Sequence, residues 1–416
     1  MEYKRVNGRI DVNDAIDRGL IVYDEDEKHG SDIRYKFWFN NYGWIYKEVD
    51  NDYSTFQDYA ELISYEIANL LGIDCAEYDL AVYNGKKGVI SKSVVKEGEK
   101  IVSGTDLLST VYDEYFVPKL ELYNNFNKLL EEYAVNSLND LDKIDDKKKN
   151  KFIDKLIILY NQSCNSITDM IKDNSKIDIK ELFEYCSSLS DVYDGNFKEM
   201  KNGIMKSNNL YDIWSAVEIY SKISGYKVDS SSFMKDLTNL FVFDIITSQG
   251  DRHADNWSVI IDNKTGKLRL SGIYDNSGAL ALNRSKAIVN IDDFSNKLAV
   301  ENRPNKRKGI YRRLKEIINH SFSGLKVTSD NVMNRNKNDV LLNTFIGHSS
   351  MEFVERLKKC SDIISDDSNI ERIFNNIERK TGEPVPNIVK NVAKEVLKYN
   401  VDTINEIIDV RRGIHK

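Results

Sequence analysis

One polar stretch constrains the fold of this chain more than any other: Gly250-Asp251-Arg252-His253-Ala254-Asp255-Asn256-Trp257, just after a mostly apolar segment at 236–248. The apolar segment predicts a buried helix. Two strand-like runs then flank a turn at 263–266, and Asp275 follows the second run. This order predicts a helix, a polar loop and a hairpin that bring a second aspartate back to the loop.

The spacing of Asp251 and Asn256, with four residues between them, is that of a phosphotransferase catalytic loop. In such a loop the aspartate orients the attacking hydroxyl or accepts its proton, and the asparagine carbonyl oxygen binds magnesium. Asp275 can bring a carboxylate to the same metal, because Mg²⁺ takes hard oxygen ligands together with substrate phosphate. Each motif alone arises often by chance in a chain rich in Asn and Asp. Their joint spacing therefore carries the prediction of an ATP- and Mg²⁺-dependent site.

Such a site also needs a lysine for the α- and β-phosphates and a glutamate that fixes it from the next helix. Strand alternation over 44–49 places Lys47 between two β-branched neighbours, where burial is unfavourable unless the lysine is paired or binds an anion. The alternative is an exposed lysine on an edge hairpin. The following helix offers Glu61 and Glu66, and five residues turn a helix by about 500°. Only one of the two can face Lys47, and the helical pattern does not choose between them.

Chain order places the remaining parts of a nucleotide site. Gly30 and Ser31 lie in a loop between the first two predicted strands, where a phosphate-cradling loop belongs. That loop has one glycine instead of the three of a GxGxxG motif. Backbone groups near Ile90, Ser91 and Ser93, at the end of a later strand, are expected to bond the adenine edge.

Composition excludes several other classes of protein. The chain has 416 residues, 59 Lys and Arg, 66 Asp and Glu, and a net charge of -7, so we expect no general nucleic-acid binding. Apolar residues make up 41%, enough for a folded core at this length. No apolar run approaches the roughly 18 residues of a membrane span, and no signal-peptide core follows the first residues. The four cysteines form no CxxC pair, and we expect free thiols in a cytoplasmic protein.

The secondary-structure pattern predicts an α+β protein with a bilobal, protein-kinase-like fold. Residues 1–110 read as a small mixed β lobe, in the order strand, strand, helix, strand, strand, and carry the phosphate lysine. Residues 111–416 read as a large, mainly helical lobe, which contains the catalytic hairpin at 250–276 and the C-terminal helices.

These residues resemble the HipA-like serine/threonine kinases, and within them the compact, CtkA-like branch. The resemblance covers about 30–282, with a poorly matched helical stretch at 112–233. The matching segments are 30–31, 36–39, 44–47, 60–73, 76–81, 88–91, 250–257 and 274–277. The extra N-terminal subdomain of the longer HipA toxins finds no counterpart, which weakens any inference of an antitoxin partner or a DNA-bound complex.

The resemblance assigns roles to the residues of the nucleotide site. It implies that Lys47 is the ATP-phosphate lysine and Asp251 the catalytic aspartate. It also implies that Glu61 is the helix partner of Lys47, because Glu61 stands eleven residues before Gly72, as the family's glutamate stands before its helix-ending glycine.

The resemblance also assigns the metal ligands and the loop residues. Asn256 would be a magnesium ligand, and Asp275 would correspond to the aspartate of the kinase DFG motif, although Asn276 stands where ordinary kinases have Phe-Gly. His253 would support the geometry of the loop. Ser31 falls near the position where some relatives phosphorylate their own phosphate loop and switch themselves off.

The implied activity is transfer of the ATP γ-phosphate to Ser or Thr of an unidentified protein substrate, including autophosphorylation. Two alternatives stay open. Phosphoinositide lipid kinases share the Gly-Asp-Arg-His sequence, and the basic segment 303–315 would then face a membrane, or else form a solvated helix face. The second alternative is a pseudokinase that binds nucleotide and acts as an interaction module. The Lys-, Asn- and Ile-rich composition points to a bacterial source.

Overall fold

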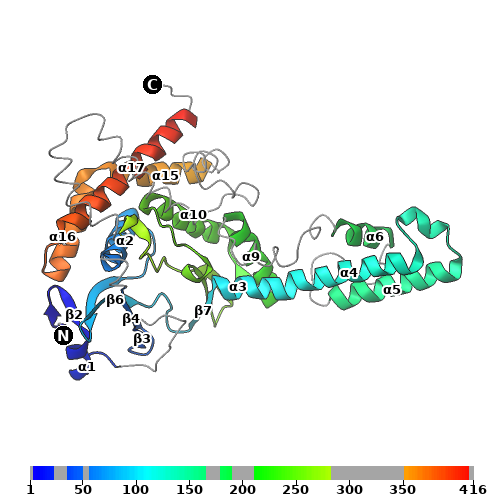
Figure 1. The fold of residues 1–416 in the computed structure, drawn as a ribbon, viewed down its shortest axis with the longest axis horizontal. Coiled ribbons are helices and arrows are strands. Elements are labelled where there is room, and N and C mark those ends of the chain that lie inside the picture. The colour runs from blue at the N-terminus through cyan, green and yellow to red at the C-terminus, as the bar shows by residue number, and fades with distance from the viewer. Residues whose placement is uncertain are drawn as a thin grey trace.

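The computed structural model describes residues 3–22, 35–49, 56–164, 179–189, 210–282 and 351–411. A β-rich lobe is followed by a mainly helical region, as Figure 1 shows. This arrangement confirms the predicted α+β class. The boundary near residue 110 stays a prediction.

Six strands form the sheet of the small lobe, in the order β1-β2-β5-β6-β4-β3. All neighbours pair antiparallel except β2 and β5, which are parallel. The predicted hairpin is present as β3 and β4, and the later strand pair as β5 and β6. The bounds of these elements are β1 (Arg5–Val6), β2 (Arg9–Asp11), α1 (Val12–Asp17), β3 (Lys36–Phe39), β4 (Trp44–Glu48), β5 (Tyr78–Tyr83) and β6 (Lys86–Lys92).

Helix α2 (Gln57–Leu71) connects the two halves of this sheet in the chain and packs between the sheet and the C-terminal helices. Apolar residues at helical spacing, such as Ala60, Ile63 and Ile67, form its buried face. The helix ends at Gly72, whose φ of 65° is left-handed and therefore favours glycine.

A second sheet of four strands carries the predicted catalytic hairpin, β9 (Ser258–Asp262) and β10 (Lys267–Leu270). Its order is β7-β9-β10-β8, with β7 (Glu99–Ser103) and β8 (Lys227–Val228) at the edges. Strand β7 lies within 1–110 in sequence, yet it pairs with β9. The chain therefore leaves the six-stranded sheet after β6.

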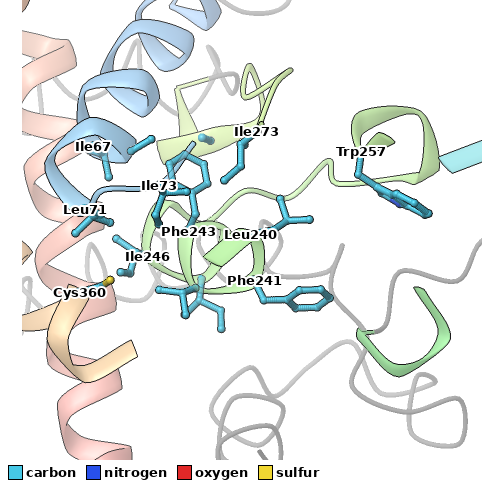
Figure 2. Packing of buried hydrophobic residues seen from close by; sticks show 14 of the residues in the cluster. Ile67, Leu71, Ile73, Leu240, Phe241, Phe243, Ile246, Trp257, Ile273 and Cys360 are labelled. Atoms are coloured by element: carbon cyan, nitrogen blue, oxygen red, sulfur yellow. The ribbon is translucent and has the colours of Figure 1, made fainter. Parts of the chain in front are cut away.

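The predicted apolar helix is α10 (Ser230–Thr247), and it lies at the centre of the main core. It begins six residues earlier than the apolar run because Asp229 caps it. Helices α15 (Met351–Ser365) and α17 (Asn387–Arg411) pack against it, and the same core includes α2, against which α16 (Asp367–Thr381) packs. Figure 2 shows Leu71 of α2, Ile246 of α10 and Cys360 of α15 within this cluster.

A helical arm extends from the body of the molecule and has its own hydrophobic core (Figure 1). Phe126, Phe152 and Phe183 form the centre of that core. Sequence analysis predicted helices here but no separate core. The elements of this region are α3 (Gly104–Val111), η1 (Tyr112–Phe116), α4 (Val117–Tyr133), η2 (Leu138–Asp142), α5 (Asp146–Cys164) and α6 (Ile179–Ser188), and α9 (Leu210–Ser224) then returns to the body.

In the described part of the chain, no helix combines the length and the apolar character that a membrane crossing requires. Cys75, Cys186 and Cys360 are free thiols.

Candidate active site

Lys47 lies between two carboxylates that come from distant parts of the chain. Its Nζ is 2.6 Å from Oδ1 of Asp275 and 4.0 Å from Oε1 of Glu61. The alternation of side chains along β4 explains the direction in which Lys47 points. Tyr46 packs into the hydrophobic core on one face of the sheet, and Lys47 projects from the opposite face. The side chains of Lys47 and Asp275 are 26% and 29% exposed, so the pair is partly screened from water.

The structure brings Glu61, and not Glu66, to Lys47. Glu61 is 1% exposed, and its Oε2 accepts the backbone N–H of Asn276 at 2.7 Å. Within the described residues its Oε1 accepts no hydrogen bond. Glu66 instead accepts a hydrogen bond from Asn376 of α16 at 3.0 Å. The contact with α16 fixes the rotation of α2, which the helical pattern alone left open.

The two carboxylates next to Lys47 differ in acidity. Burial raises the pKa of Glu61 to about 7, against the opposing effect of Lys47, and the charge of Asp275 adds to the rise. Burial would also raise the pKa of Asp275, but the ion pair with Lys47 outweighs it and the pKa falls to about 2. Asp275 is therefore ionised at any working pH, whereas Glu61 titrates near neutrality.

Arg252, in the polar loop after α10, holds that loop and the Asp275 segment together. It is 2% exposed and pairs with Asp244 of α10, with Nη2 2.9 Å from Oδ1. It also donates to the carbonyl oxygens of Asn256 at 2.8 Å and Tyr274 at 2.6 Å, and to Oδ1 of Asn276 at 2.8 Å. One buried guanidinium thus links three segments by hydrogen bonds to charged and carbonyl groups.

Asp251 and Asn256 are presented differently by the same loop. The Asp251 side chain is 62% exposed and therefore accessible from the solvent. The Nδ2 of Asn256 donates to the Asp251 carbonyl at 2.7 Å. Because a carbonyl only accepts, this bond sets the orientation of the amide and presents Oδ1 for a cation. Gln249 joins the loop to the second aspartate: Nε2 donates to the Asp275 carbonyl at 2.9 Å, and Oε1 accepts the Asp251 N–H at 3.3 Å.

Among the described residues, the hydrogen-bonding partners of His253 belong to the same loop. Its Nδ1 accepts the N–H of Asp255 at 3.3 Å, which caps the short helix η3 (Ala254–Asn256), and its Nε2 lies 3.3 Å from Nδ2 of Asn256. These contacts suit a residue that supports the loop, which is the role that the resemblance implies for His253. Further along, Gly278 permits the close approach of the loop, since a Cβ there would lie 2.5 Å from Oε1 of Gln249.

The predicted nucleotide contacts fall in three places. Gly30 and Ser31 lie outside the described residues. Ile90 and Ser91 lie in β6, which pairs on both sides with β4 and β5, so the ladders take up their backbone groups. The N–H of Ser93 donates to Gly43 at 2.8 Å. Of the described residues none bonds the N–H or C=O of Val94, one position further on, and this is where the backbone can receive an adenine edge.

A metal ion held by protein side chains alone is not supported in the described ranges, where no three His, Cys, Asp or Glu residues gather. Asn256 and Asp275 fit a different arrangement, in which Mg²⁺ takes one amide oxygen, one carboxylate and oxygens of a nucleotide phosphate. The exposed fraction of Asp275 and the presented Oδ1 of Asn256 agree with that donor set.

Sequence reasoning did not identify Tyr78, Gln249 or the Asp244–Arg252 pair as parts of the site. Arg252 stands inside the motif, and Asp244 interrupts an apolar run, which is a signal for a buried charge with a partner. Tyr78 carried no such signal. Its hydroxyl accepts the N–H of Asp275 at 2.9 Å, across 197 positions of sequence.

No family model and no curated protein matches this chain. Solved structures similar to it include the crystal structure of a Helicobacter pylori proinflammatory kinase, CtkA, at 15% identity, covering 91% of this chain and 95% of that one, with a TM-score of 0.44. Another is HipA from Shewanella oneidensis MR-1, in a toxin–antitoxin complex with HipB and operator DNA, at 11% identity, covering 96% of this chain and 72% of that one, with a TM-score of 0.39.

Proposed function

We propose that this chain is a kinase that transfers the γ-phosphate of ATP, with Mg²⁺, to a Ser or Thr hydroxyl of a protein. The observation that supports it best is the meeting of Lys47, Glu61 and Asp275, which come from β4, from α2 and from the segment after β10. The loop of Asp251 and Asn256 is hydrogen-bonded to the last of these segments. A lysine, two carboxylates and an Asp–Asn loop are the parts that phosphoryl transfer requires.

Each residue has a role that its surroundings suit. Lys47, held by Glu61, would bind the α- and β-phosphates and release Asp275. Asn256 and Asp275 would hold Mg²⁺, which neutralises phosphate charge when bound. Asp251 is exposed and can orient the acceptor hydroxyl and take its proton. Catalysis in this scheme comes from positioning and charge neutralisation.

The acceptor class rests on the resemblance to HipA-like kinases. The basic segment 303–315, on which a lipid acceptor would depend, lies outside the described residues. A cytoplasmic location and a protein partner as substrate belong to the same proposal.

The direct test is incubation of the purified chain with γ-labelled ATP and Mg²⁺. We expect label on protein Ser or Thr with the wild type, and a loss of at least about 100-fold in Asp251→Ala and Asp275→Ala, which remove a base and a metal ligand. Asp154→Ala, on the exposed side of α5, is the matched control and should keep full transfer.

Other outcomes of this test exclude the proposal in different ways. Label only on added phosphoinositide vesicles would indicate a lipid kinase. Magnesium-dependent ATP binding without transfer to protein or water would indicate a pseudokinase. Absence of nucleotide binding would mean that the site is not a phosphotransferase site at all.

We expect kcat/KM to rise with pH through about 7, because the ionised form of Glu61 attracts Lys47. Asp275, with a pKa of about 2, contributes nothing to this limb. For stability the sign is opposite: a raised folded pKa means that Glu61 favours folding below its ordinary 4.5 and loses that contribution as pH rises through about 7.

The measurement is kcat/KM between about pH 5.5 and 9, which reports groups of the free enzyme. Glu61→Gln should abolish the limb and lower the plateau, whereas Glu66→Gln should keep both. An unchanged limb in Glu61→Gln would show that another group controls the pH dependence.

A further inference from the structure

Two successive backbone amides of the Asp275 segment are held by the small lobe. The N–H of Asp275 donates to the hydroxyl of Tyr78, on β5, at 2.9 Å. The N–H of Asn276 donates to Oε2 of Glu61, on α2, at 2.7 Å. The segment that carries Asp275, a predicted metal ligand, is therefore held to β5 and to α2 by one hydrogen bond each.

Asp275 needs such support because its backbone conformation is unfavourable. Its φ is 54°, in the left-handed region that residues with a side chain seldom adopt. On the other side, Gln249 donates to its carbonyl at 2.9 Å. Both backbone polar groups of Asp275 are thus bonded to side chains, and the Tyr78 hydroxyl is the partner from the small lobe.

Tyr78 is itself held firmly. It is 3% exposed and its ring belongs to the main core. Nζ of Lys380, on α16, donates to its backbone carbonyl at 2.8 Å and lies 3.5 Å from Oε1 of Glu77.

We infer that Tyr78 is a positioning residue: its hydroxyl holds the Asp275 backbone in the left-handed conformation. The inference rests on the proposed kinase function and deepens it. Tyr78 touches neither substrate nor metal in this scheme. It acts through the backbone of Asp275, so that the carboxylate of this predicted metal ligand keeps a fixed position relative to Lys47.

The substitution Tyr78→Phe removes the hydroxyl and keeps the ring in the core. The matched control is Tyr46→Phe on β4, which is also buried and loses a bond to the Lys86 carbonyl at 3.0 Å, away from the site. In Tyr78→Phe we expect kcat to fall by on the order of 10- to 100-fold, since a small displacement of a catalytic group has effects of this size. The Mg²⁺ concentration for half-maximal rate should rise, whereas Mg²⁺-free nucleotide binding through Lys47 should stay near wild type.

The Mg²⁺ dependence and local hydrogen exchange separate positioning from a general structural role. Hydrogen exchange should become faster at the amides of Asp275 and Asn276 in Tyr78→Phe only.

Three results would decide the matter. Slowed transfer, a higher Mg²⁺ requirement and faster local exchange in Tyr78→Phe alone would support the inference. An active wild type with a Tyr78→Phe variant that matches it in kcat, Mg²⁺ requirement and exchange would overturn the inference and leave the proposed function standing. A wild type without transfer would overturn the proposed function and the catalytic role of Tyr78 together.

Discussion

Replacement of Lys47 by methionine should lower the rate of phosphotransfer by on the order of 10²- to 10³-fold, the size of effect seen when one charged or donor group is removed from a developing phosphate or oxyanion charge. The length of the side chain is kept while the ammonium is lost. Two consequences follow in the protein itself. Asp275 loses its ion-pair partner, so its pKa should rise from about 2, and Glu61 becomes harder still to ionise.

The rate is measured with saturating Mg²⁺ and a range of ATP concentrations, so that kcat and KM are separated. Lys87→Met, an exposed lysine on the neighbouring strand β6, is the matched control and should behave as wild type. Lys47→Arg should recover little of the loss, because a planar guanidinium does not replace a compact ammonium between two carboxylates. A Lys47→Met variant with wild-type kcat would contradict the role assigned to the lysine.

Lys47 and Glu61 should also behave as a unit. Because their charges act through one contact, the loss in the Lys47→Met and Glu61→Gln double variant should be clearly smaller than the product of the two single losses. Multiplicative losses would show that Glu61 acts on something other than Lys47.

Local patterns predicted the elements that carry this site. Periodicity and turn residues within a few positions predict three of these elements. They are the hairpin of β3 and β4, the buried helix α10 and the catalytic hairpin of β9 and β10. Lys47 was found in the same way, because alternation along one strand is a local property.

Choices that depend on packing could not be made from the sequence. Glu61 and Glu66 are equivalent until α16 docks and Asn376 binds Glu66, from 310 positions away. The ladders on both sides of β6 take up the backbone groups of Ile90 and Ser91, the predicted adenine contacts, and this pairing is not visible in the sequence. Such contacts are set by tertiary structure, which no single-segment pattern records.

The helical arm shows the same limit on a larger scale. Helical spacing indicates that α4, α5 and α6 each have an apolar face, but it does not say which helices share a core. The separate core around Phe126, Phe152 and Phe183 is a property of their mutual packing. Conformations such as the left-handed Asp275 are equally invisible, since they are imposed by partners in other lobes.

Arg252→Met is expected to destabilise the body of the protein by about 3–5 kcal/mol, the range observed when one member of a buried ion pair is removed. Arg252 and Asp244 are both almost fully buried, with side chains 2% and 0% exposed. Without the guanidinium, the Asp244 carboxylate is left uncompensated, and the carbonyls of Asn256 and Tyr274 lose their donor. Transfer activity should disappear with the geometry of the loop.

A second substitution tests the electrostatic cause of that loss. In urea unfolding, Arg252→Met combined with Asp244→Asn should be more stable than Arg252→Met alone, because the isolated charge is gone. Burial already raises the pKa of Asp244, and loss of Arg252 raises it further, so the single variant should regain stability as pH falls and the carboxyl takes up a proton. Arg269→Met, which breaks the more exposed pair with Glu99, should cost no more than about 1 kcal/mol. Equal losses in Arg252→Met and Arg269→Met would show that burial of the Asp244–Arg252 pair does not govern its effect, and that the loop is held mainly by its apolar neighbours.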